Sequence, residues 1–278
     1  MQVPNPTWFA GCGNMGSAII DGWRAADIDL ANVTVIRPSA APVAGVRTVG
    51  SFAEAGAPPK LVVLAVKPQK LDEVAAQLRP WLTSRAAIVS ILAGVEVASL
   101  RKRFANGGAI VRALPNLPVA IRRGVVALYS EDAPDELRSQ LGGLFTSLGF
   151  GMWMADEARL AAVGSVAGAG PAYVARFVAA LAKAGEQRGL TSEIAATVAL
   201  ETVLGTAWLA ATTGEGMDDI ARRVASPNGT TEAGLAVLDR DQVLDQLVGV
   251  TIDAAARRGR ELAEEAKGAS LEEPARLS

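Results

Sequence analysis

Three glycines that follow a short apolar run form the first segment of the chain able to bind a ligand. The run Trp8–Ala10 leads into Gly11, Gly13 and Gly16, and a helical pattern begins at Asn14. In such a strand–turn–helix unit the first glycine permits the turn, the second admits a pyrophosphate and the third allows close packing of the helix. The helix N-terminus then attracts phosphate groups. The segment predicts a dinucleotide site, although glycines at this spacing also occur in ordinary tight turns.

The residue after the second predicted strand indicates which dinucleotide binds. In NAD-binding folds, an acidic residue about twenty positions after the glycines holds the ribose 2′-hydroxyl. Here the strand Val33–Ile36 runs into Arg37, Pro38 and Ser39 without an acid. A guanidinium forms charge-assisted, often bidentate hydrogen bonds with a phosphate. We therefore predict NADP, with NADPH preferred over NADH. The alternative is that Arg37 is a solvated charge at the end of the strand.

Three later loops carry further candidate ligands. Lys67 ends the strand at residues 61–66, and Asn116 lies between two prolines of the segment 112–118. Both positions follow strands whose carboxyl ends line the ligand crevice in this architecture. The alternatives are that Lys67 is a surface lysine and that the prolines beside Asn116 only shape a loop. The segment Ser226–Thr231 precedes a helical stretch, so its amides predict an anion site. Simple helix capping by Ser or Thr is the alternative.

The elements that position these loops alternate in the first half of the chain. Short β-branched runs predict buried parallel strands, and amphipathic segments between them predict helices. This alternation is typical of a doubly wound α/β sheet of the Rossmann type. The expected strands are 8–10, 33–36, 61–66, 87–92, 109–111 and 125–128, and the expected helices are 14–26, 69–82, 95–104 and 134–148.

The second half of the chain has a different pattern, since strand signals vanish after about residue 155. We predict a dinucleotide-binding domain over residues 1–155 and an all-α domain over residues 156–278. The predicted helix Ala172–Arg188 is apolar on most of its circumference, with Tyr173, Phe177 and Leu181 on it. A helix without a polar face must be buried on all sides. We therefore expect this helix to lie in a core formed between subunits.

Composition excludes several classes of protein. The 278 residues contain no histidine, which removes His-based catalytic triads and HExxH metal sites, and we expect no metal. Cys12 is the single cysteine, so no disulfide forms within the chain. The formal charge of −2 argues against a nucleic-acid partner. The chain shows no signal peptide and no uninterrupted apolar span, so we expect a cytoplasmic protein without a membrane partner.

Six motifs occur in order along the chain: FAGCGNMGSAI at 9–19, LAVKPQ at 64–69, VSILAGV at 89–95, RALPNLP at 112–118, AGAGPAY at 167–173 and SPNGTT at 226–231. Together they resemble the pyrroline-5-carboxylate reductase family. The resemblance implies a Rossmann domain followed by a helical dimerisation domain, and homodimers that can assemble further into a decamer. It also implies reduction of the cyclic imino acid 1-pyrroline-5-carboxylate to L-proline, the last step of proline biosynthesis.

The resemblance also implies roles for single residues. Thr231 corresponds to a hydroxyl beside the substrate nitrogen and is the expected catalytic residue. Substrate binding is expected from Ser226, Gly229, Thr230, Thr231 and Glu157. Cofactor binding is expected from Gly11, Cys12, Gly13, Asn14, Met15, Gly16, Arg37, Ser39, Ala65, Val66, Lys67, Ala93 and Asn116.

Departures from the family pattern lie mainly on the substrate side. The family usually reads SGSGPAY, where this chain has Ala167 and Ala169, and SPGGTT, where it has Asn228. These changes leave open a reductase of a related cyclic imino acid, such as a six-membered or 2-carboxylate analogue. A further alternative is a catalytically silent dinucleotide-binding paralogue, which would have no need of the segment 226–231.

Overall fold

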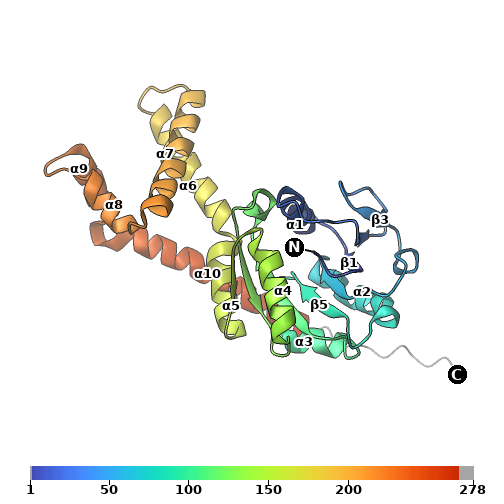
Figure 1. Cartoon of the computed structure of the whole chain (residues 1–278). Coiled ribbons are helices and arrows are strands. Elements are labelled where there is room, and N and C mark those ends of the chain that lie inside the picture. Colours follow the sequence, from blue (N-terminus) through green and yellow to red (C-terminus); the bar gives the residue numbers. More distant parts are fainter. Residues whose placement is uncertain (1, 269–278) are drawn as a thin grey trace. The chain divides into compact units, whose positions relative to one another are not determined.

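The computed structural model describes residues 2–268 and divides them into two compact units (Figure 1). The first unit contains the chain up to Ala169 together with the residues from Ala255 onward. The second unit is Gly170–Ala254. Each unit has its own architecture and is described separately.

An eight-stranded sheet organises the first unit. Its order is β3-β2-β1-β4-β5-β6-β7-β8, and every neighbouring pair is parallel except β6 and β7. The strand order reverses between β1 and β4, and ligands bind at such a switch point in doubly wound sheets. The strands are β1 (Thr7–Ala10), β2 (Val33–Ile36), β3 (Arg47–Val49), β4 (Leu61–Leu64), β5 (Ala87–Ser90), β6 (Ile110–Pro115), β7 (Gly124–Tyr129) and β8 (Gly149–Trp153).

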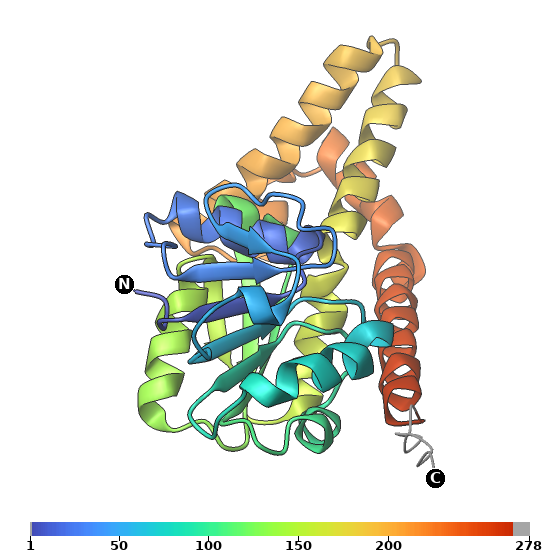
Figure 2. The ribbon, with the colours of Figure 1, turned by 90° about the vertical axis from the view of Figure 1, so that its right-hand side faces the viewer.

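Helices cover both faces of this sheet because successive strand residues point to opposite sides (Figure 2). Phe9 packs on the face covered by α1 (Asn14–Ala25) and α4 (Asp135–Thr146). Trp8 packs on the other face, beneath α2 (Leu71–Leu78) and α3 (Val97–Arg103). Both aromatic side chains are fully buried. The strands therefore read as continuous apolar runs, as expected for a sheet covered on two sides.

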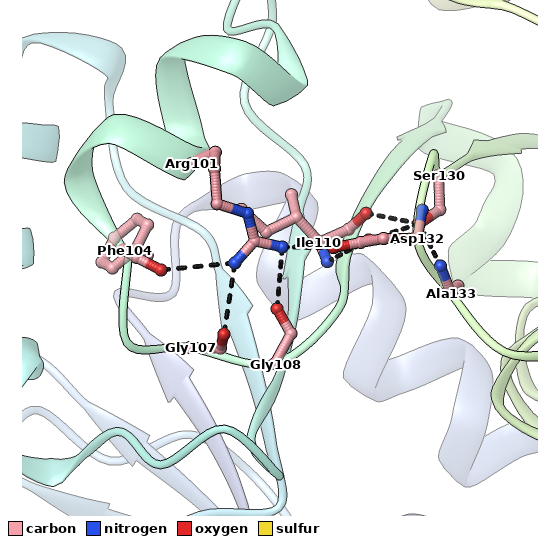
Figure 3. Close-up of polar contacts among 8 residues, drawn as sticks. All are labelled: Arg101, Phe104, Gly107, Gly108, Ile110, Ser130, Asp132 and Ala133. Atoms are coloured by element: carbon pink, nitrogen blue, oxygen red, sulfur yellow. Dashed lines mark hydrogen bonds and ion pairs between the residues drawn. The ribbon is translucent and has the colours of Figure 1, made fainter.

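A polar network surrounds the first residue of β6 (Figure 3). The Arg101 guanidinium donates to the carbonyl oxygens of Gly107 (3.2 Å) and Gly108 (2.9 Å) and pairs with Asp132. Asp132 accepts the backbone N–H of Ile110 at 3.1 Å, and the Ser130 hydroxyl donates to the Ile110 carbonyl at 2.7 Å. All of these side chains bond to other groups of the fold, so we infer that the network holds α3, β6 and β7 together.

One helical stretch runs from the first unit into the second. It consists of α5 (Glu157–Val163), a π-helical turn (Gly164–Gly168) and α6 (Gly170–Glu186). The second unit continues with α7 (Ser192–Thr213), α8 (Met217–Val224), α9 (Thr230–Leu238) and the first half of α10 (Val243–Gly268). Helices α6 and α7 pack as a hairpin, with Gly185 close to Leu190 and Ala195.

The second unit exposes many large apolar side chains in the single chain. On α6 and α7, the Phe177 and Trp208 side chains are 53% and 57% exposed. A soluble surface seldom carries so many contiguous apolar groups unless another protein surface covers them. The stretches Glu157–Glu186 and Ser192–Thr213 would also be long and apolar enough to span a membrane, which is weak evidence because interface and core helices satisfy the same test.

The structure corrects the sequence-based expectation in two respects. All six predicted strands exist, but the strand at 125–128 is antiparallel to β6 rather than parallel. The connection from β6 to β7 contains only the short 3-10 turn Leu117–Ile121, and a parallel pair needs a longer crossover. Strands β3 and β8 were not expected, because both are only partly buried and β8 carries two glycines.

Candidate functional site

Backbone hydrogen bonds place three loops in a row at the carboxyl edge of the sheet. Each bond joins the first residue after one strand to the last residue of its neighbour, so the loops after β1, β4 and β5 start at the same level. The bonds run from the N–H of Gly11 to Ile36 (2.8 Å), of Ala65 to Ala10 (2.9 Å) and of Ile91 to Leu64 (3.2 Å). This edge includes the switch point between β1 and β4, where a dinucleotide is expected.

The glycine turn after β1 has the geometry that a pyrophosphate requires. Gly11 has φ +82°, and a Cβ there would lie 2.5 Å from the Val66 side chain, so only glycine fits. Gly13 precedes α1, and a Cβ at this position would meet no atom of residues 2–268 within 4 Å. At Gly16 a Cβ would lie 3.3 Å from the Ala65 Cβ, which shows how closely α1 packs on the sheet. The open space at Gly13 fits a phosphate approaching the backbone.

The start of α1 is electrostatically suited to an anion. Its first turn contains no acidic residue, so the positive end of the helix dipole is not neutralised from within the helix. Asn14 and Met15 begin the helix, and the first N–H groups of a helix have no partner in its own ladder. The Cys12 sulfur lies 3.4 Å from the Ser17 hydroxyl. The turn thus offers N–H donors and a dipole in one place.

Arg37 lies beside this turn. Its Nε donates to the Ala41 carbonyl at 2.8 Å, and Nη1 approaches the Cys12 carbonyl at 3.4 Å. The Ser39 hydroxyl, two residues on, is exposed and accepts the N–H of Ala41 at 3.4 Å. The guanidinium is therefore anchored at Nε, while the contacts of its outer nitrogens with the described part of the chain are long, at 3.4 and 3.5 Å.

The remaining predicted cofactor residues differ in accessibility. Lys67 and Ala93 are exposed in the loops after β4 and β5, and Ala65 and Val66 are partly buried. Asn116, by contrast, is 6% exposed, and its side chain is used within the fold. Its Nδ2 donates to the Ala167 carbonyl (3.1 Å), and its Oδ1 accepts the N–H of Val125 (2.8 Å). Asn116 thus ties the end of β6 to β7 and to the π-helical turn.

Glu157, expected at the substrate, also has partners within the first unit. Its Oε1 accepts the backbone N–H of Val97 at 2.8 Å and the Arg112 Nη1–H at 3.1 Å. The sequence contained Arg112 in a motif but did not show that this side chain is 6% exposed and pairs with Glu157. Burial, together with the carboxylates of Glu131 and Glu157, raises the pKa of the neighbouring Tyr129.

The segment Ser226–Thr231 forms a turn at the start of α9 in the second unit. Asn228 has φ +57°, a left-handed conformation that asparagine tolerates better than other residues with a Cβ. Asparagine in place of the family's glycine therefore preserves the turn. The carboxylate of Glu232 accepts the Asn228 N–H at 2.6 Å, and Gly229 precedes the helix. The first N–H groups of α9, including that of Thr231, have no partner in the helix ladder, although Glu232 places a carboxylate in the same first turn.

Fold and site together define a class of protein: a dinucleotide-dependent oxidoreductase with a Rossmann-type nucleotide unit and a separate helical unit. Two family models match this chain. Residues 8–94 match "NADP oxidoreductase coenzyme F420-dependent", and residues 157–262 match "Pyrroline-5-carboxylate reductase dimerisation".

Individual proteins give the same result over nearly the whole chain. Pyrroline-5-carboxylate reductase of Pseudomonas aeruginosa is 38% identical over 264 residues, covering 92% of this chain and 96% of the relative. The structure of the Plasmodium falciparum pyrroline carboxylate reductase with NADP bound has a TM-score of 0.85 at 25% identity, covering 95% and 99% of the two chains. The Coxiella burnetii enzyme has a TM-score of 0.84 at 29% identity, covering 94% and 99%. The chain belongs to the pyrroline-5-carboxylate reductase family.

Proposed function

We propose that this protein reduces 1-pyrroline-5-carboxylate to L-proline with NADPH as the preferred donor. The observation that carries the proposal is the match to a pyrroline-5-carboxylate reductase over 92% of the chain, which includes both the nucleotide segment and the helical segment. The glycine turn, the α1 N-terminus and Arg37 support the choice of cofactor. The segment Ser226–Thr231 supports a substrate that carries a carboxylate.

The residues of the first unit bind and orient the cofactor. NADPH, when bound, supplies the hydride that reduces the carbon–nitrogen double bond. The open backbone at Gly13 and the N–H groups of α1 would hold the pyrophosphate. The outer nitrogens of Arg37, with the Ser39 hydroxyl, would hold the 2′-phosphate. Ala65, Val66 and Lys67 would flank the ribose side, and Ala93 and the backbone near Asn116 the nicotinamide.

The residues of the second unit position the imino acid. The N–H groups at the start of α9 would bind the carboxylate together with Ser226. The Thr231 hydroxyl would hydrogen-bond the ring nitrogen and so orient the ring. A protonated imine is already electrophilic, so orientation rather than a strong acid is the main requirement. The absence of histidine from the sequence is compatible with a mechanism that needs no strong acid.

The apolar faces of α6 and α7 support a homodimer as the working form. The match of residues 157–262 to a dimerisation family agrees with this assignment. Exposed groups such as Phe177 and Trp208 would then be covered by a second copy of the chain rather than by lipid. We further propose a cytoplasmic location and, on the family resemblance, assembly of dimers into a decamer.

A second candidate function is reduction of a related cyclic imino acid. The alanines at 167 and 169, which replace family serines, favour it, whereas Asn228 does not because it preserves the turn. The test measures NADPH oxidation with 1-pyrroline-5-carboxylate, its 2-carboxylate isomer and the six-membered analogue. We expect the highest kcat/KM with 1-pyrroline-5-carboxylate. A higher value with another imine would establish the second candidate, and NADPH binding without turnover of any imine would establish a silent paralogue.

A further inference from the structure

The loop between β5 and α3, residues 91–96, carries the predicted nicotinamide contact Ala93. It starts in the row of loops at the carboxyl edge, where Ile91 N–H donates to the Leu64 carbonyl at 3.2 Å. Within the first unit, parts of the chain 60 or more residues away hold this loop from two directions. We propose that Glu157 is a positioning residue of this cofactor loop and not a ligand of the imino acid. The inference rests on the proposed function, because it needs the loop to contact the cofactor.

Glu157 acts as a helix cap supplied by another helix. Val97 is the first residue of α3, and its N–H has no partner in the helix itself. The Glu157 Oε1 accepts that N–H at 2.8 Å, so the carboxylate fixes the point where the loop enters α3. Residue 96, which precedes α3, makes no side-chain cap of its own. The cap is therefore provided by Glu157.

Arg112 holds the Glu157 carboxylate in this position. Its Nη1 donates to the same Oε1 at 3.1 Å, and its side chain is only 6% exposed. Asp156 caps α5 by accepting the N–H of Arg159 at 2.7 Å, which fixes the helix turn that carries Glu157. Two donors of the fold thus share one carboxylate oxygen of Glu157, Oε1, and this pairing fixes the orientation of the carboxylate.

The second support comes from the end of α10. Gly94 has φ +74°, and a Cβ there would lie 2.7 Å from the Leu262 Cβ and 3.0 Å from the Leu262 carbonyl carbon. The helix backbone therefore lies directly on the loop, near α3 (Figure 1). Lys267 also pairs with Glu96 at 3.1 Å. Held at Gly94 and at Val97, the loop keeps Ala93 exposed in one defined position.

A preorganised loop binds its ligand more tightly because less conformational freedom is lost on binding. This gives Glu157 an effect that a substrate ligand would not have, namely on NADPH binding in the absence of any imine. Two conservative variants separate the effect of side-chain length at position 157 from the effect of its charge. Glu157→Gln keeps an acceptor at the same distance without the charge, whereas Glu157→Asp keeps the charge but is one methylene too short to reach Val97.

The experiment titrates the full-length wild type and the variants with NADPH alone, following the fluorescence of the bound coenzyme. Amide hydrogen exchange at residues 91–97 is measured on the same proteins without NADPH. We expect Glu157→Asp to weaken NADPH binding about fivefold, the usual cost of losing a helix cap, and to speed exchange at Val97. Glu157→Gln should bind within about twofold of wild type, although the loss of the charge opposite the buried Arg112 lowers the melting temperature. Glu136→Asp, in the exposed first turn of α4, is the matched control.

The results distinguish this inference from the proposed function. If wild type binds NADPH and Glu157→Asp binds it equally well, the positioning role is refuted, and a rise in the KM for the imine alone would make Glu157 a substrate ligand. If Glu157→Gln loses as much affinity as Glu157→Asp, the cap at Val97 is not the cause and the inference fails. Faster exchange without weaker binding would also refute it. Wild type that does not bind NADPH would overturn the cofactor proposal itself.

Discussion

Replacing Arg37 by leucine tests the cofactor assignment most directly. The Nε of Arg37 is anchored on the Ala41 carbonyl at 2.8 Å, so the side chain is oriented before any ligand arrives. The contacts of its outer nitrogens with residues 2–268 are long, 3.4 Å to Cys12 and 3.5 Å to Pro42. Exchanging these contacts for a phosphate therefore costs little. Leucine keeps part of the apolar stem and removes the charge and all the guanidinium donors, including the Nε that bonds to Ala41.

The expected magnitude follows from two charge-assisted hydrogen bonds. Each contributes about 1.5 kcal/mol or more to binding when it is well formed. Because the guanidinium is only partly buried, solvent reduces the sum, and we take about 1.5–2 kcal/mol for the pair. At about 1.4 kcal/mol per tenfold, the preference for NADPH over NADH should fall about ten- to thirtyfold. The loss should appear only with NADPH, since NADH has no 2′-phosphate.

The assay compares kcat/KM for NADPH and for NADH at a fixed imine concentration. Arg47→Leu is the matched control, because Arg47 lies on the neighbouring β3 and donates to the carbonyls of Ala55 (3.0 Å) and Glu54 (2.6 Å). The control should leave the ratio of the two coenzymes unchanged. An unchanged ratio in Arg37→Leu, or an equal loss with both coenzymes, would refute the role of Arg37.

Four further predictions concern single residues. Gly13→Val fills the open space before α1, so NADPH affinity should drop more than tenfold while the melting temperature stays within a few degrees. Asn228→Gly should leave the KM for the imine within about twofold, whereas Asn228→Val, strained at φ +57°, should raise it severalfold. Thr231→Ala should lower kcat about tenfold and Thr231→Ser much less, and equal rates in all three proteins would exclude the hydroxyl from the mechanism. Tyr173→Phe leaves Tyr129 as the only tyrosine, and its raised pKa means that it should ionise above pH 10 in the folded protein. The tyrosinate absorbance of the folded protein should therefore rise at a higher pH than that of the protein unfolded in urea, and the free energy of unfolding should fall above pH 10.

Local patterns in the sequence were sufficient for much of the fold and for the glycine turn after β1. Buried parallel strands appear as uninterrupted apolar runs, so the central strands could be recognised from residues such as Val62 and Val63 alone. The glycine turn could be recognised because the backbone at each position has a local requirement that glycine satisfies. The structure shows these requirements as a positive φ at Gly11 and open space at Gly13. Strands β3 and β8 gave no such pattern.

Side-chain partners distant in sequence were not predictable. Asn116 was expected at a ligand from its place between two prolines and from the family resemblance, and Glu157 from the resemblance alone. Their polar atoms instead bond to Ala167 and Val97, 51 and 60 residues away. The predicted division between residues 155 and 156 stays a prediction. Packing separates the compact units after Ala169 and returns the end of α10 to the first unit.

By itself, the sequence determined the alternation of strands and helices, the glycine turn after β1 and the membership of the family, because these depend on short-range spacing and on ordered motifs. Only the tertiary structure decided which polar atoms are already paired within the fold and which remain open. That distinction depends on contacts between remote segments, such as Leu262 on Gly94, where the free energy of packing is independent of separation along the chain.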